Sequence, residues 1–287
     1  MSRRRPEGTP AAEALQGAVT AIAAAGCETP RLDAEVLLAD VLGVSRERLL
    51  TDRDLLVVGP AVRAFQSAVR RRAVEREPVA YITGRRAFRH LELKADRRAL
   101  IPRPETELLV EAGLKLPQGA AVLDLCTGSG AVALALKQER PDLDLTGSDI
   151  SAPALALARE NASLLGLDVA WLHADLLDGV PDRFDAILAN PPYVAEGERA
   201  ALAPEIARHE PPQALFAGPD GLAAIAALAA QLEARERVAT VAIEVGDGQA
   251  ERAGELLAES GFQSVRYEVD LGGITRVVIA RRGRRLS

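Results

Sequence analysis

The stretch of the chain best suited to chemistry is Asn190-Pro191-Pro192-Tyr193, which follows the apolar run 184–189. The run indicates a buried strand, and the two prolines end it because neither can donate a ladder hydrogen bond. Asn190 precedes a proline, so its backbone is held extended at the carboxyl end of the strand, where open α/β sheets bind ligands.

This corner offers two hydrogen-bond acceptors in a stiff arrangement, the Asn190 carboxamide oxygen and a fixed main-chain carbonyl. Together they can hold both hydrogens of a planar NH2 group, which exposes the nitrogen lone pair for attack. The face of Tyr193 can stack on a flat substrate. The alternative is a proline turn that does no more than end a strand.

A second set of polar groups follows three further predicted strands. A glycine-rich turn after the first strand lets the backbone approach a ligand closely, but it lacks the third glycine of the dinucleotide fingerprint. A carboxylate about twenty residues on can hold ribose hydroxyls, and an acid at the third strand end can face the exocyclic amine of adenine. These observations favour a nucleoside without phosphates as the ligand. The residues are Cys126, Thr127, Gly128, Ser129 and Gly130 in the turn, then Asp149, and then Asp175 with Leu176.

Alternating strands and helices from residue 120 onward predict the sheet that positions these groups. Residues from about 10 to 76 are instead predicted as helices, since Pro10, Pro30 and Pro60 are helix-start signals and Ser45 is a capping residue. Between them, alternation around Gly84 suggests a hairpin linker. The predicted strands are 121–125, 143–148, 169–173, 184–189 and 238–245, with 262–269 and 274–280 as a closing pair. The predicted domains are 1–77, 78–101 and 102–287.

Composition limits the possible partners and compartments. The 287 residues carry a net charge of -6, so a broad nucleic-acid-binding surface is not indicated. Arg3-Arg4-Arg5 before the apolar stretch 17–25 is typical of a signal peptide, but Glu7 and Glu13 interrupt the pattern and helical spacing favours a cytosolic amphipathic helix. We therefore expect a cytoplasmic protein without a membrane span, a metal or a stable nucleic-acid complex.

Taken together, these strings resemble a class I S-adenosylmethionine-dependent methyltransferase, and more narrowly the release factor glutamine methyltransferases, the PrmC/HemK family. The resemblance covers roughly residues 10 to 280. The Asn-Pro-Pro-Tyr string is shared with DNA and RNA amino methyltransferases, whereas the string 101–107 beside an N-terminal helical bundle is more particular to this family. The matching stretches are 77–84, 101–107, 124–130, 190–193, Glu210-Pro211 before Ala214-Leu215, Glu244-Val245-Gly246 with Gln249, and Asp270-Leu271-Gly272 with Arg276.

The resemblance implies an α/β protein with three parts. A small all-α bundle of five helices holds the release factor, a β-hairpin links it onward, and a Rossmann-like, seven-stranded methyltransferase domain follows. The implied substrate is the glutamine of the Gly-Gly-Gln motif of peptide chain release factors, and the implied methyl donor is S-adenosyl-L-methionine, which becomes S-adenosyl-L-homocysteine. Asn190 and the Pro191 carbonyl would hold the amide, Pro192 would belong to the same substrate site, and Tyr193 would pack on the substrate. We also expect Asn190 to contact the donor.

The chain departs from the family pattern at two places. Cys126 stands where glycine is usual, and we interpret it as a packing substitution and not as a nucleophile. The usual Pro-Gly-Gly before the fifth strand is replaced by residues 233–237. Two other hypotheses remain open here: methylation of an exocyclic amino group of DNA or RNA, and a regulator with a dead site. The net charge argues against the first and the intact Asn-Pro-Pro-Tyr string against the second.

Overall fold

The computed structural model describes residues 8–283, so Arg3-Arg4-Arg5 and the outer ends of the first and last predicted domains lie outside it. The described chain divides into two units. One contains residues 8–84 and 203–209, and the other contains residues 85–202 and 210–283.

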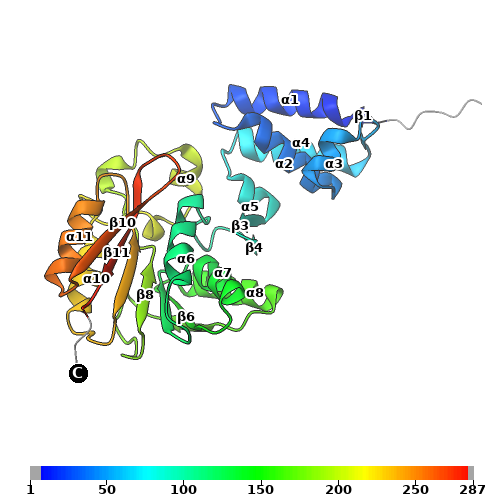
Figure 1. Cartoon of the computed structure of the whole chain (residues 1–287). Helices are drawn as coiled ribbons and strands as arrows, with labels where there is room; N and C mark the ends of the chain where they lie inside the picture. The colour runs from blue at the N-terminus through cyan, green and yellow to red at the C-terminus, as the bar shows by residue number, and fades with distance from the viewer. Residues whose placement is uncertain (1–7, 284–287) are drawn as a thin grey trace, which may run out of the picture. The chain divides into compact units, whose positions relative to one another are not determined.

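The first unit is helical (Figure 1). Its core contains Ile22, Leu37, Leu38 and Phe65, which come from three different helices. The local signals act as predicted: proline starts α2 and α4, and the Ser45 hydroxyl accepts from the Arg48 N–H to cap α3. The elements are β1 (Thr9–Pro10), α1 (Ala11–Ala24), α2 (Pro30–Leu42), α3 (Arg46–Thr51), β2 (Leu56–Val57), α4 (Pro60–Ala73), α5 (Val79–Thr83) and α9 (Pro204–His209).

Helix α9 joins this unit although it comes from far along the chain. Glu205 of α9 forms ion pairs with Arg72 and Arg76, and Arg72 also pairs with Asp33 of α2. The Arg72 side chain is almost completely buried, so the two carboxylates replace part of the hydration that its guanidinium loses, while its Nη1 finds no partner within residues 8–283. The sequence pattern did not predict this helix.

The predicted hairpin linker is only partly present in the structure. Residues 79–83, which alternate like a strand, form the helix α5, and the Thr83 hydroxyl donates to the Val79 carbonyl one turn back. Gly84 ends the helix in the left-handed conformation, and Ala80 and Tyr81 are buried. Burial of these adjacent side chains outweighs the strand preference of a β-branched and aromatic segment. The hairpin itself is shorter, formed by β3 (Arg85–Phe88) and β4 (Leu91–Lys94).

The second unit is built on a seven-stranded sheet, as predicted. Its strand order is β10-β11-β9-β8-β5-β6-β7, and β5 to β9 are parallel while β10 and β11 close the edge antiparallel. The strands are β5 (Ala121–Leu125), β6 (Asp144–Asp149), β7 (Ala170–His173), β8 (Ala186–Ala189), β9 (Thr240–Glu244), β10 (Ser264–Val269) and β11 (Thr275–Arg281).

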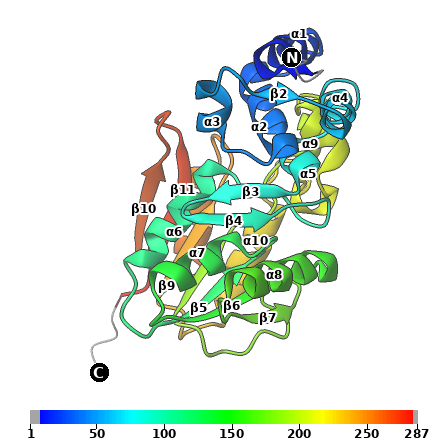
Figure 2. The ribbon, with the colours of Figure 1, turned by 90° about the vertical axis from the view of Figure 1, so that its right-hand side faces the viewer.

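Helices cover both faces of this sheet (Figures 1 and 2). Side chains alternate between faces along β5, so Val122 packs in one core with α6 and α7 while Leu123 packs in the other with α10 and α11. This is a Rossmann-like arrangement. The helical segments are η1 (Pro104–Thr106), α6 (Glu107–Leu114), α7 (Ala131–Glu139), α8 (Ala152–Leu165), η2 (Glu196–Glu198), η3 (Pro212–Ala214), α10 (Ala223–Leu232) and α11 (Ala250–Glu259). Across residues 8–283, every helix is too short or too polar to cross a bilayer.

Candidate functional site

The strand register brings the separate predicted motifs together. Leu125 of β5 pairs with Ala189 of β8 on one side and with Ser148 of β6 on the other. The next residues along these strands are Cys126, Asn190 and Asp149, so the three lie side by side at the carboxyl edge of the sheet. The strand order reverses between β5 and β8, which is the switch point where such sheets bind ligands.

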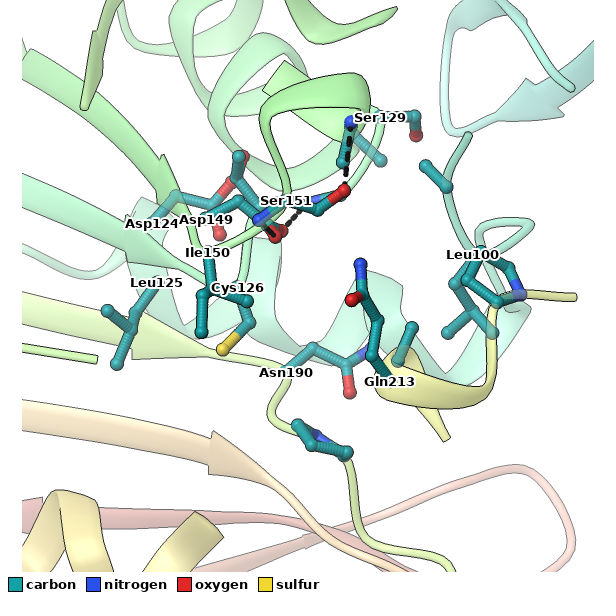
Figure 3. Close-up of a pocket in the computed structure, with 18 of the residues that line it drawn as sticks. Leu100, Asp124, Leu125, Cys126, Ser129, Asp149, Ile150, Ser151, Asn190 and Gln213 are labelled. Carbon is teal, nitrogen blue, oxygen red and sulfur yellow. Dashed lines mark hydrogen bonds between the residues drawn. The ribbon is translucent and has the colours of Figure 1, made fainter. Parts of the chain in front are cut away.

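A cavity of about 380 Å³ opens at this edge, within the size range of small-ligand sites (Figure 3). It contains most of the residues that the sequence singled out, but Gly130, Pro191 and Tyr193 do not line it. Gly130 caps α7 in the left-handed conformation instead, and Pro191 is buried. The lining residues among those predicted are Cys126, Thr127, Gly128, Ser129, Asp149, Asp175, Leu176, Asn190 and Pro192.

Asp124 anchors the glycine-rich turn through hydrogen bonds. This buried carboxylate accepts from the Thr127 hydroxyl and from the Ala133 N–H in the first turn of α7. Burial raises its pKa to about 7, against the lowering effect of these hydrogen bonds. Gly130 has no room for a side chain, since a Cβ there would lie 2.9 Å from the Trp171 ring. Helix, turn and sheet are therefore packed tightly around this loop.

Cys126 adopts a left-handed backbone conformation with φ of 59°, which explains why glycine is usual at this position. Burial raises the pKa of its thiol, and the carboxylates of Asp149, Asp124 and Asp175 raise it further. A thiol with a raised pKa is a poor nucleophile. This agrees with our interpretation of Cys126 as a packing residue.

Asp149 organises the next part of the cavity. Its Oδ2 accepts from the Gly128 N–H at 2.9 Å and its Oδ1 from the Ser151 N–H at 2.8 Å. Burial raises the pKa of Asp149, and these hydrogen bonds work in the opposite direction. Each oxygen keeps a second lone pair, which suits a ligand hydroxyl. Asp175 and Leu176 lie at the end of β7, and Leu176 has φ of 48°.

Asn190 is fixed by backbone and side chain alike. Its N–H donates to the Leu125 carbonyl at 3.3 Å, and its Nδ2 donates to the Thr106 hydroxyl oxygen at 3.3 Å. The neighbouring Tyr193 hydroxyl donates to Glu244 Oε1 at 3.2 Å, and the Tyr193 carbonyl accepts from Gln249 Nε2 at 2.8 Å. The amide of Asn190 is thus held with its NH2 end on Thr106.

Sequence reasoning did not assign roles to several residues of this neighbourhood. Thr106 and Arg103 line the cavity, and Glu210 accepts from Arg103 and from the Ile101 N–H. Glu244 lies beside Asn190 because Ala189 pairs with Ile243. These residues lie within strings that match the family pattern, namely 101–107, Glu210-Pro211 and Glu244-Val245-Gly246. The residue types alone do not indicate what role each one has.

These residues fit an adenosyl sulfonium ligand. The cavity has the required volume, a strand-end carboxylate with spare lone pairs, and apolar walls that include Ile150 and Leu176. Asp149 and Asp175 supply negative charge at the strand ends, which favours a cationic guest there, while Arg98 and Arg103 add positive charge elsewhere in the same lining.

Comparisons with known proteins cover both units. The family model for the PrmC N-terminal domain matches residues 13–84, and the model for the methyltransferase small domain matches residues 104–218. The chain is 42% identical over 263 residues to a release factor glutamine methyltransferase of Rhodospirillum rubrum, covering 90% of this chain and 81% of that protein. It is also 42% identical over 281 residues to the protein of the same name in Mycolicibacterium smegmatis, covering 94% and 96%.

Solved structures support the fold. A methyltransferase from Pyrococcus furiosus superposes with a TM-score of 0.53 at 18% identity, covering 69% of this chain and 92% of that one. The catalytic domain of hMettl16, in complex with an RNA hairpin, superposes with a TM-score of 0.54 at 16% identity, covering 79% and 83%. At these identities the likeness concerns the Rossmann-like methyltransferase fold alone.

Proposed function

The chain belongs to the release factor glutamine methyltransferase family, and from this premise we propose how its own residues carry out S-adenosylmethionine-dependent methylation of a release factor glutamine. The observation that supports the proposal best is the position of Asn190. It follows β8 directly opposite the glycine-rich turn, and it lines the same cavity as Asp149.

The donor would be held by the chain's own strand ends. Asp149 accepts from ribose hydroxyls, Asp175 faces the adenine amine and Leu176 packs against the ring, while the turn 126–130 gives the backbone close access. When bound, S-adenosyl-L-methionine supplies an electrophilic methyl group on a sulfonium. We assign no metal to this site.

The substrate amide would be held by acceptors. Asn190 Nδ2 is already engaged by Thr106, so Oδ1 is left to accept one hydrogen of the glutamine NH2. The Pro191 carbonyl accepts the other, Pro192 shapes the same corner, and Tyr193 packs on the substrate. With both hydrogens bound, the nitrogen lone pair is oriented for transfer, and orientation supplies most of the rate gain.

The partner would be a bacterial peptide chain release factor that presents its Gly-Gly-Gln motif, and the helical unit is its docking module. Because release factors work on cytoplasmic ribosomes, we place the enzyme in the cytoplasm. We expect neither a stable nucleic-acid complex nor membrane attachment.

A transfer assay tests the function. Tritiated methyl donor is offered with the purified enzyme to a release factor, to the same factor with its motif glutamine changed to asparagine, to a Gly-Gly-Gln peptide and to DNA. Label should appear on the intact release factor and be lost in the asparagine control. Label on DNA alone would refute the proposal.

The Asn190→Ala variant tests the site. We expect a loss of about 100-fold or more in kcat, because the variant removes an acceptor that holds the reacting group. Donor binding, measured by calorimetry with S-adenosyl-L-homocysteine, should survive in part. Unchanged turnover would contradict the role given to Asn190.

A further inference from the structure

Glu244 is a buried carboxyl for which the reaction described above has no use. It is the last residue of β9 and is 1% exposed. Its Oε1 accepts from the Tyr193 hydroxyl, whereas its Oε2 finds no complete hydrogen bond within residues 8–283. Burial raises the pKa of Glu244 to about 7, and Glu105 raises it further. Keeping such a group buried costs stability, which points to a functional reason.

The register places this carboxyl beside the substrate-holding corner. Ala189 of β8 pairs with Ile243 of β9, so the following residues, Asn190 and Glu244, are neighbours across the two strands. Glu244 is not among the residues that line the cavity. It can therefore act on the reaction only through other side chains.

Thr106 provides the connection. It is 4% exposed, and its hydroxyl oxygen accepts from Asn190 Nδ2. A buried hydroxyl that accepts one hydrogen bond still carries a hydrogen that needs an acceptor. Thr106 and Asn190 both lower the pKa of Glu244, and the buried Glu244 Oε2 lacks a donor within residues 8–283, so this oxygen is the candidate acceptor for the Thr106 hydrogen.

We propose that Glu244 is a positioning residue that fixes, through Thr106, which end of the Asn190 amide faces the substrate. A carboxylate can only accept, so Thr106 must donate to it and must accept from the NH2 end of Asn190. The amide oxygen is then the end left for the substrate. If the Asn190 amide were flipped, its NH2 group would face the NH2 group of the substrate, and the hydrogens of the two groups would repel each other. This inference rests on the proposed function, in which Asn190 accepts from a substrate NH2.

Protonation of Glu244 should weaken this control, since a neutral carboxyl can donate as well as accept. Glu105 raises the pKa of Glu244, and Arg103 and Arg276 lower the pKa of Tyr193, whose hydroxyl donates to Glu244. We therefore expect kcat to rise with pH through about 7, as Glu244 becomes ionised.

Two near-isosteric variants test the inference in the full-length enzyme with the release factor as substrate. Glu244→Gln replaces an obligate acceptor by a group that can donate, and Thr106→Val removes the connecting hydroxyl. Each should lower kcat by tenfold or more, leave the affinity for S-adenosyl-L-homocysteine within about twofold, and abolish the rise in kcat near pH 7. Thr106→Ser keeps the hydroxyl and should recover most of the kcat lost in Thr106→Val.

A double variant and a surface control complete the design. Because both residues act in one chain of hydrogen bonds, the Glu244→Gln/Thr106→Val double variant should lose no more kcat than either single variant. Glu259→Gln, at the exposed end of α11, controls for the amide substitution itself.

The outcomes separate this inference from the proposed function. If the unaltered enzyme labels no release factor, the proposed function fails and the inference with it. If that enzyme is active while Glu244→Gln and Thr106→Val keep its kcat and its pH profile, the function stands and the inference is overturned. A matching loss of donor affinity with an unchanged pH profile would likewise overturn it, because Glu244 would then only support the fold.

Discussion

At the scale of single residues, Asp149 holds together the segments that form the donor site. One carboxylate binds the turn through Gly128 and the start of α8 through Ser151, and its remaining lone pairs face the cavity. In the proposed function, the same residue therefore shapes the site and accepts hydrogen bonds from the donor. Substituting it should affect donor binding more than global folding.

Asp149→Ala should weaken S-adenosyl-L-homocysteine binding by tenfold or more, because hydrogen bonds to a charged group contribute about 1.5–3 kcal/mol. Titration calorimetry measures this dissociation constant. Asp144→Ala is the matched control, since Asp144 begins the same strand and forms an exposed ion pair with Arg183. Dissociation constants within twofold of each other for the two variants would contradict this role.

At the scale of elements, one glycine lets two loops meet. Gly221 precedes α10 with φ of 76°, and a Cβ there would lie 2.2 Å from the Tyr193 carbonyl oxygen and 2.6 Å from Gln249 Nε2. Gln249, before α11, donates to that carbonyl and accepts from the Gly246 N–H. The Asn-Pro-Pro-Tyr corner is thus held between the segments that start α10 and α11.

Gly221→Ala should destabilise the protein by about 2–4 kcal/mol and lower kcat, since a left-handed alanine adds strain and its methyl group displaces Tyr193. Urea unfolding and initial rates measure the two effects. Gly179→Ala is the control, because Gly179 has φ of 75° with open space around it and should lose only about 1 kcal/mol. Equal losses in the two variants would show that close contact with Tyr193 does not matter.

At the scale of the whole molecule, buried carboxyls govern how stability depends on pH. Burial raises the pKa of both Asp124 and Glu244 to about 7, so the unfolded chain ionises these groups at lower pH than the folded one. Their contribution to stability is present at low pH and is lost as the pH rises through about 7. Arginine partners lower the pKa of Glu35, Asp96 and Glu139, whose stabilisation is lost only as the pH falls to acidic values.

The free energy of unfolding should therefore be a few kcal/mol lower at pH 8 than at pH 5, since each pKa unit corresponds to about 1.4 kcal/mol. Trp171, the one tryptophan of the chain, lies in β7 and reports the unfolding of the sheet unit by fluorescence. An Asp124→Asn/Glu244→Gln variant should show a flatter profile. Greater stability at pH 8 than at pH 5 would mean that other groups dominate.

The sequence alone determined the elements of the sheet and the residues that end its strands. Apolar runs located β5 and β8, and glycine and proline marked their ends, because such signals act within a few residues and need no distant partner. The same local chemistry indicated Asp149 and Asn190. Residues 79–83 show the limit of this reasoning, since burial there turned a strand-like segment into α5.

The tertiary structure alone decided which distant residues meet. Strand order and register place Glu244 beside Asn190, and they depend on packing summed over two cores rather than on any short pattern. In the same way, α9 joins the helical unit because Glu205 pairs with the buried Arg72 and the partly buried Arg76, which lie more than a hundred residues away along the chain. Contacts of this kind form only when the whole chain has folded.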